Sequence, residues 1–250
     1  ESKYRACLTM EKLLPATRDF HAINLDKSLC LFFFDSNTLS QSQVTAMADS
    51  WLSAEEKQTL DKRKQLTAKK EFIATRGIIK FQLARYFQLD AKAIKVHFDP
   101  QDTCLKAYIY QDSSPKEYQE QLPVQICISH SHGKVLVAMS RESTCLGVDL
   151  ERRKPERPWL KLTRHFYHQE EVKQIEAGGV DMFYRIWTLK EALAKAVKQP
   201  IARLLSQHIA PMLAPYTVIS GQYLDFDLSL ITDLPLQQAE LTVIESFAQE

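Results

Sequence analysis

A short segment near the middle of the chain, Gly147-Val148-Asp149-Leu150-Glu151, alternates apolar and acidic residues. Side chains on a β-strand leave its two faces in turn, so the pattern predicts a strand over 145–151. Val148 and Leu150 would then point toward a core, and both carboxylates would leave the other face. Because alternating acids are also common on solvated strands, this pattern alone leaves an ordinary surface strand open.

A second segment, residues 181–198, has the period of an amphipathic helix. One stripe is apolar and consists of Ile186, Leu189, Leu193 and Val197; a separate stripe contains Trp187, Glu191 and Lys195. A Glu–Lys pair one turn apart is most often a surface ion pair worth about 0.3–0.5 kcal/mol. Two carboxylates on a strand, with a carboxylate and an amine on a helix, would also suit Mg²⁺ holding a phosphate, because this ion binds a few carboxylates together with water and phosphate oxygens.

Composition narrows the classes of protein that this chain can belong to. Its 250 residues can form one large domain or two small ones, and 45% hydrophobic with 25% charged residues is typical of globular proteins. A net charge of +1 provides no overall basic field for nucleic acid. Glycine is scarce and no G-x-x-x-x-G-K-[ST] loop is present, so side chains or helix ends must hold any phosphate.

Cysteine usage and hydropathy indicate a cytoplasmic protein. The five cysteines are odd in number and include no C-x-x-C pair, which argues against a disulfide framework or a zinc site; they are Cys7, Cys30, Cys104, Cys127 and Cys145. No stretch approaches the roughly 20 apolar residues of a membrane span, and the charged start lacks a signal-peptide core. We therefore expect no membrane association.

The rest of the pattern predicts an α+β chain. Strands are expected near 29–34, 94–98, 105–110, 124–129, 135–140, 216–220, 223–230 and 239–246. Helices are expected from Ser53, with a capping box to Glu56, and over 69–87, 159–166 and 168–177. A His-Gly turn joins the strands around residue 132, Gly178-Gly179 separates two helices, and Pro200 follows the end of the last one. A seam near residue 140 would divide the chain into lobes 1–140 and 141–250.

Three blocks together resemble the signature of the 4′-phosphopantetheinyl transferases, specifically the two-lobed Sfp-like type. They are Ile128-Ser129-His130-Ser131-His132-Gly133, the strand Gly147–Glu151, and Trp187-Thr188-Leu189-Lys190-Glu191-Ala192-Leu193-Ala194-Lys195. The resemblance covers most of the chain but is specific only at these blocks. It implies two similar lobes related by a pseudo-twofold, each with a small, mainly antiparallel sheet packed by helices, and an active site in the cleft.

The resemblance also implies roles for residues of the second half. Asp149, Glu151 and Glu191 would hold Mg²⁺, and Glu191 would act as, or orient, the base for an attacking hydroxyl. Lys195 would neutralise phosphate charge at the leaving oxygen. Lys190, about 100° away around the helix, would contact another part of the phosphates.

For the nucleotide end of coenzyme A, the resemblance points to residues of the first half. Ser129 and His130 would contact its phosphates, and Arg76, Lys80 and Lys106 would lie at the 3′-phosphate or the adenine rim. Lys80 stands where the family commonly has a second arginine, Lys106 is all that remains of a Gly-Lys-Pro element, and Cys127 replaces an asparagine. Past the signature helix, Lys198-Gln199-Pro200 replaces the usual glycine-rich turn.

The function implied is Mg²⁺-dependent transfer of 4′-phosphopantetheine from coenzyme A to a serine of an acyl, aryl or peptidyl carrier protein, with release of 3′,5′-ADP. The chain would act as a monomer, and its basic residues Arg152, Arg153, Lys154, Arg157 and Arg164 could attract an acidic carrier. The carrier's pathway (fatty acid, polyketide or nonribosomal peptide) is left open. Two alternatives also remain open: a non-catalytic protein that binds coenzyme A or a carrier, and another Mg²⁺-dependent phosphohydrolase or nucleotidyltransferase.

Overall fold

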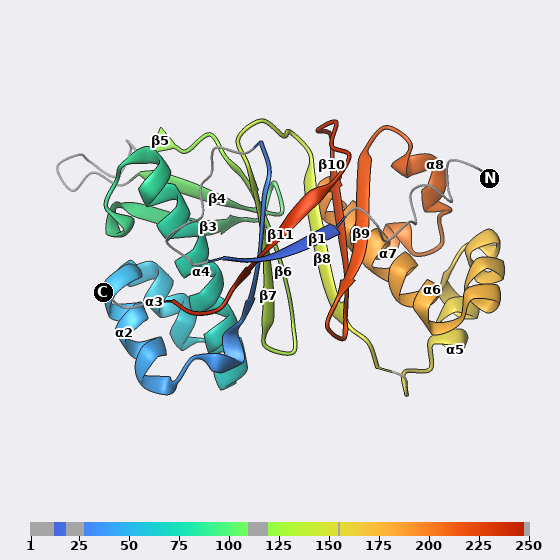
Figure 1. Cartoon of the computed structure of the whole chain (residues 1–250), viewed down its shortest axis with the longest axis horizontal. Coiled ribbons are helices and arrows are strands. Elements are labelled where there is room, and N and C mark those ends of the chain that lie inside the picture. The colour runs from blue at the N-terminus through green and yellow to red at the C-terminus, as the bar shows by residue number, and fades with distance from the viewer. Residues whose placement is uncertain (1–12, 19–27, 110–119, 155, 248–250) are drawn as a thin grey trace. The chain divides into compact units, whose positions relative to one another are not determined.

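A computed structural model of the chain describes residues 13–18, 28–109, 120–154 and 156–247 (Figure 1). Their contacts divide them into two compact units. The N-terminal unit contains residues 16–142 and 241–247, and the C-terminal unit contains residues 143–240 together with 13–15. The expected seam near residue 140 lies beside this division. The expected lobe 141–250 is corrected at its end, because the last strand pairs with a strand of the N-terminal unit.

Both units combine mainly antiparallel sheets with helices, which confirms the α+β class. The larger sheet has eight strands among the described residues, in the order β1-β11-β2-β7-β6-β4-β3, with β5 paired to β4. The strands are β1 Leu13–Arg18, β2 Cys30–Asp35, β3 Ile94–Asp99, β4 Cys104–Ile109, β5 Glu120–Gln121, β6 Gln125–Ser131, β7 Lys134–Ser140 and β11 Ala239–Ile244. β11 runs parallel to β2, whereas β2, β7, β6, β4 and β3 are antiparallel to their neighbours.

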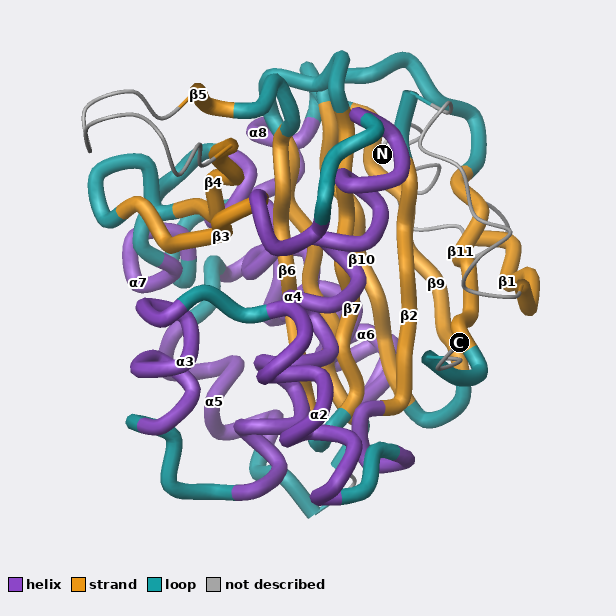
Figure 2. The backbone as a smooth tube through the Cα atoms, turned by 90° about the vertical axis from the view of Figure 1, so that its left-hand side faces the viewer, coloured by secondary structure: helices purple, strands orange, loops and turns teal. Residues whose placement is uncertain are grey.

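Helices pack against this sheet and bury its core (Figure 2). They are α2 Gln41–Trp51, α3 Ala54–Asp61 and α4 Leu66–Phe87, with short 3-10 turns η3 Ser36–Thr38 and η4 Ala91–Ala93. α4 packs across β7 and β3, and its Ile73, Ile79 and Leu83 are fully buried. The capping box predicted at Ser53 and Glu56 is confirmed. α2 was not predicted from the sequence, although Ser40 and Gln43 also form a capping box at its start.

The turn between β6 and β7 confirms the expected His-Gly hairpin. His132 and Gly133 have φ values of 53° and 79°, as a two-residue turn of the I′ type requires at both central positions. A side chain at Gly133 would also lie only 2.2 Å from the Asn37 side chain. This close approach fixes the turn against the chain that follows β2.

The C-terminal unit contains a three-stranded antiparallel sheet in the order β8-β10-β9, covered by α6. Its elements are β8 Leu146–Arg152, α5 Trp159–Phe166, α6 Gln169–Ala196, α7 Ile201–Leu204, α8 Ile209–Leu213, β9 Thr217–Tyr223 and β10 Phe226–Thr232. Val148 and Leu150 are buried, as the alternation predicted. Within α6, Gly179 has a φ of 68° and a non-helical ψ, so the helix breaks where the two glycines indicated.

Gly147 sets the distance between β8 and α6. A Cβ at this position would lie 2.0 Å from the carbonyl oxygen of Ala192 and 2.7 Å from the backbone nitrogen of Ala196. Only a glycine on the strand, opposite small residues on the helix, permits backbones to approach so closely. The glycine of the Gly147–Glu151 segment therefore brings the last two turns of α6 onto the strand that carries the acids.

Other features of the described chain differ from expectation in detail. Tyr223 of β9 pairs with Phe226 of β10, so the turn between these strands includes Leu224, which has a φ of 55°. The expected strands near 216–220 and 223–230 had placed this turn two to three residues earlier. After the signature helix, Lys198 takes the left-handed conformation, with a φ of 55°, where the family usually has a glycine-rich turn.

Cysteines 30, 104, 127 and 145 form no disulfide, and Cys7 lies outside the described residues. No helix in the described ranges is long and apolar enough to cross a bilayer.

Candidate active site

β8 and α6 bring four of the expected residues together in the C-terminal unit. The amine of Lys195 donates to Asp149 Oδ1 at 2.8 Å and to the carbonyl oxygen of Val148 at 2.9 Å. Asp149 is 5% exposed, whereas Glu151, Glu191 and Lys195 are half-buried. The acids on alternate positions of β8 therefore share the side of the sheet that α6 covers.

Burial and neighbouring charge raise the pKa of two carboxylates of this group, Glu151 and Glu191. Burial raises the pKa of Glu151, and the charge of Asp149 raises it further. Burial also raises the pKa of Glu191, with additional contributions from Asp149 and Glu151, while Lys195 opposes the shift. Three acids in one electrostatic field repel one another, and a bound cation would remove this conflict.

The donor set of Asp149, Glu151 and Glu191 fits Mg²⁺. No three His, Cys, Asp or Glu side chains within the described residues are already gathered as ligands of one ion. Mg²⁺ needs no closed cage, however, since it usually binds one or two carboxylates, keeps several waters and takes substrate phosphate oxygens. The three carboxylates supply the hard oxygen donors that such an ion requires. Burial and the charges of the neighbouring acids raise the pKa of Glu151 and Glu191, and a cation would offset this repulsion.

Arg157 extends this acidic group toward α5. Its guanidinium lies 3.5 Å from Glu151 Oε1 and 4.8 Å from the ring centroid of Trp187. It also borders a pocket of about 650 Å³, whose other lining residues are Pro158, Trp159, Leu160, Lys161, Arg164 and His165. The sequence had indicated Arg157 only as one charge in a basic loop.

Lys190 requires a correction. Its side chain is fully buried, and its amine contacts Glu171 Oε2 at 2.8 Å and the carbonyl oxygens of Leu204 and Gln207 at 2.8 and 2.7 Å. Burial lowers the pKa of Lys190 despite the neighbouring carboxylate. Glu171 also accepts a hydrogen bond from the backbone of Ile209 at 3.0 Å. The expected phosphate contact is therefore contradicted, and Lys190 instead anchors the segment after α7.

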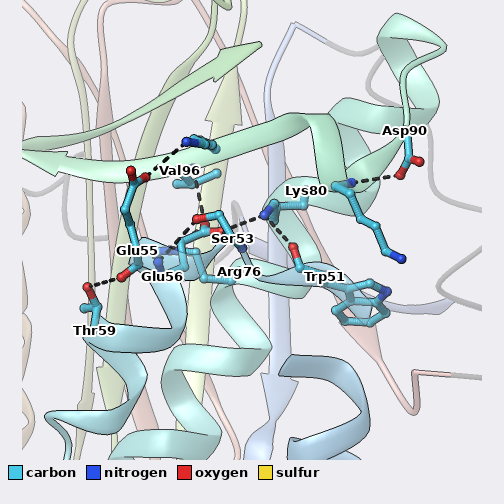
Figure 3. A network of polar contacts seen from close by, with 11 residues as sticks. Trp51, Ser53, Glu55, Glu56, Thr59, Arg76, Lys80, Asp90 and Val96 are labelled. Carbon is cyan, nitrogen blue, oxygen red and sulfur yellow. Dashed lines mark hydrogen bonds and ion pairs between the residues drawn. The ribbon is translucent and has the colours of Figure 1, made fainter. Parts of the chain in front are cut away.

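Arg76 and Lys80 belong to a buried network in the N-terminal unit (Figure 3). Lys80 is fully buried and donates to Glu56 Oε2 at 2.7 Å and to the carbonyl oxygen of Trp51 at 2.5 Å. Arg76 is 6% exposed, its Nε lies 3.8 Å from Glu56 Oε1, and burial lowers its pKa to about 10. Glu56 thus pairs with cations in addition to capping α3. The expected coenzyme A contact of Lys80 is corrected to this structural role.

Lys106 lies between two carboxylates on the β3–β4 hairpin. Its amine is 2.5 Å from Asp102 and 2.7 Å from Asp99, and these hydrogen bonds raise the pKa of Lys106. The same contact lowers the pKa of Asp99 to about 2. A phosphate at Lys106 would have to compete with both acids.

Ser129 and His130 lie at the end of β6, and α4 supplies a partner that the sequence analysis missed. His130 is 55% exposed, and its Nδ1 is 3.1 Å from Glu71 Oε2. Glu71 Oε1 accepts the Gly133 backbone N–H at 2.8 Å, whereas Ser129 is 6% exposed. The sequence signal that could have identified Glu71 is its place directly before the apolar Phe72 and Ile73, on the buried side of the helix. A carboxylate buried there needs hydrogen-bond donors from another part of the chain.

Comparisons with known proteins agree with these geometric observations. Residues 145–240 match the family model of the 4′-phosphopantetheinyl transferase superfamily. A Synechocystis sp. protein, provisionally named a 4′-phosphopantetheinyl transferase, is 30% identical over 162 residues, which cover 63% of this chain and 61% of that protein. The 4′-phosphopantetheinyl transferase AcpT of Escherichia coli is 30% identical over 95 residues, 36% of this chain and 48% of AcpT.

The chain thus spans less than two thirds of either relative, but the matched segment contains the whole acidic group. Its strand holds Asp149 and Glu151, and its helix holds Glu191 and Lys195. Over residues 145–240, the chain is thus similar to the 4′-phosphopantetheinyl transferase superfamily.

Proposed function

We propose that this protein transfers 4′-phosphopantetheine from coenzyme A to a serine of a carrier protein and releases 3′,5′-ADP. The observation that carries the proposal is the convergence of Asp149, Glu151 and Glu191 with Lys195 at the contact of β8 and α6. The similarity of residues 145–240 to the family model supports it, because the matched segment includes all four residues.

Asp149, Glu151 and Glu191 would hold Mg²⁺, whose bound charge offsets that of the diphosphate. Lys195, kept beside Asp149 by a 2.8 Å hydrogen bond, would neutralise charge at the leaving oxygen. Glu191, whose pKa is raised, would accept the proton of the carrier serine or orient its hydroxyl as the serine attacks the β-phosphorus. The P–O bond to the nucleotide breaks, and 3′,5′-ADP carries away the electron pair. The chain contributes positioning and charge neutralisation.

The remaining contacts to coenzyme A are part of the same proposal. His130, exposed at the end of β6, would contact its phosphates, with Ser129 beside it. Arg76 and Lys106 would reach the nucleotide only by exchanging contacts that they now make with Glu56 or with Asp99 and Asp102. The two-lobed, pseudo-twofold arrangement with the site in its cleft, the monomeric state and the cytoplasmic location also remain proposals.

The pocket beside Arg157 favours an acidic carrier as the second substrate. Arg157, Lys161, Arg164 and His165 contribute basic groups to its lining. Arg164 already pairs with Glu176 at 2.7 Å, so part of this charge is balanced within the chain. Association that speeds up at low ionic strength would support electrostatic attraction of the carrier, and salt-independent association would contradict it.

Intact-mass analysis of carrier proteins after incubation with coenzyme A and Mg²⁺ tests the proposal directly. We expect a carrier to gain one phosphopantetheine group, and Asp149→Asn or Glu191→Gln to abolish that gain while the circular dichroism spectrum is retained. Glu170→Gln is the matched control, because this exposed acid lies on the same helix and forms an ion pair with Lys173 at 2.8 Å.

Full loading by both site variants would overturn the proposal. Coenzyme A binding without any product would favour a non-catalytic binding protein. Release of phosphate or pyrophosphate without a carrier would instead indicate a phosphohydrolase or nucleotidyltransferase.

A further inference from the structure

Glu71 holds the β6–β7 turn through two different groups. One carboxylate oxygen accepts the backbone N–H of Gly133 at 2.8 Å, and the other lies 3.1 Å from His130 Nδ1. The Glu71 side chain is 10% exposed, whereas that of His130 is 55% exposed. The carboxylate therefore reaches the ring from the interior side and leaves much of the imidazole open to a ligand.

The contact specifies which nitrogen of His130 carries a proton. A carboxylate only accepts hydrogen bonds, so the nitrogen facing Glu71 must be the protonated Nδ1. Nε2 can then donate to a second group only when the ring is doubly protonated. An imidazolium between two anions is the form that would bind a phosphate oxygen most strongly.

The electrostatics of Glu71 agree with this pairing. Burial acts to raise the pKa of Glu71, but the hydrogen bond and charge of His130, the N–H of Gly133 and the charge of His132 together lower it below its ordinary value. Arg63 also lies in the field of Glu71. The carboxylate thus remains ionised beside the ring, with His132 and Arg63 as its other charged neighbours.

We infer that Glu71 is a positioning residue for His130, which it orients so that Nε2–H donates to a phosphate oxygen of coenzyme A. The inference rests on the proposed function, because it assigns coenzyme A as the ligand of His130. It extends the site to a residue on α4 that neither the signature blocks nor the matched segment includes.

A double-mutant cycle measured by calorimetric binding of coenzyme A tests the inference. We expect His130→Gln and Glu71→Gln each to weaken binding roughly tenfold, the scale of one charge-assisted hydrogen bond. Combining them should weaken binding no further than His130→Gln alone, since Glu71 acts through the ring.

Ser36→Ala is the matched control for support of the turn. The Ser36 hydroxyl donates to the carbonyl oxygen of Gly133 at 2.6 Å, so it supports the same turn through a group other than Glu71. Its removal should leave coenzyme A affinity within about twofold of the parent, because the ring keeps its carboxylate.

The outcomes separate this inference from the proposed function. If the parent binds coenzyme A and loads a carrier, but the effects of Glu71→Gln and His130→Gln multiply, then Glu71 acts independently of the ring and the inference is wrong. An equal loss in Ser36→Ala would reduce Glu71 to general support of the turn and would also overturn it. If the parent binds no coenzyme A at all, the proposed function itself fails.

Discussion

Replacing Gly147 with alanine inserts one methyl group between β8 and α6. The added Cβ would lie 2.0 Å from the Ala192 carbonyl oxygen and 2.7 Å from the Ala196 nitrogen. Both obstacles are backbone atoms, so no side-chain rotation can relieve the contact. Reaching 3.0 Å, below which Cβ contacts are essentially never seen, requires the helix and the strand to separate by about 1 Å.

This separation sets the expected magnitude. Overpacking a core typically costs about 1–3 kcal/mol. A gap of 0.5–1 Å also forfeits about a quarter to a half of each dispersion contact across the interface. We therefore expect a loss of about 3 kcal/mol in the free energy of unfolding. Because Lys195 reaches Asp149 from the same helix at 2.8 Å, carrier loading should also fall sharply.

Urea unfolding, followed by tryptophan fluorescence, measures the loss, since Trp159 and Trp187 lie in the same unit as Gly147. Gly178→Ala is the comparison: this glycine is exposed, its added Cβ would lie 2.7 Å from Met182 Cβ, and the substitution should cost less stability than Gly147→Ala. If Gly147→Ala unfolds within about 0.5 kcal/mol of the parent and still loads a carrier, the close approach is not what assembles the site.

Three other perturbations have defined outcomes. Lys190→Met should lower the free energy of unfolding by about 3–5 kcal/mol, because it leaves Glu171 buried without its cation. Adding Glu171→Leu should recover part of this loss in urea unfolding. No recovery in the double variant would contradict the role of the ion pair. The pKa of Glu71 is lowered from 4.5 in the folded protein, so ionised Glu71 stabilises the fold above pH 4.5, and this stabilisation is lost as the pH falls through the folded pKa. Glu71→Gln should therefore reduce the loss of unfolding free energy on acidification. An unchanged dependence of stability on acidic pH would refute this. Glu191→Gln removes one of the mutually repelling charges, so the melting temperature at neutral pH should not fall. Mg²⁺ should raise the melting temperature of the parent but not that of the variant. An equal effect of Mg²⁺ on both proteins would exclude Glu191 as a ligand.

Local patterns predicted those elements whose signals lie within a few residues. Alternation located β8, the helical period and the glycine pair located α6 and its break at Gly179, and Ser53 with Glu56 marked the start of α3. Each depends on backbone geometry or on hydrogen bonds between near neighbours, which the order of residues specifies directly. The three blocks that resemble the family signature are likewise short, local stretches of sequence.

The two lysines of α6 show where this reasoning stops. Sequence period separates Lys190 and Lys195 around the helix but does not say what covers either face. In the structure Lys195 meets Asp149, across 46 positions of the chain, while α7 and the following segment enclose Lys190 with Glu171. A charged side chain is a ligand or a buried support depending on the elements packed over it.

The sequence by itself determined the strand that carries Asp149 and Glu151, the helix that carries Glu191 and Lys195, and the resemblance of both segments to one family. Only the tertiary structure decided that Gly147 lets the two elements touch, that Lys80 and Lys190 are buried with acids, and that Glu71 supports His130. The physical reason is that periodicity is a property of one segment, whereas the surroundings of a charge depend on segments that folding brings to it from far along the chain.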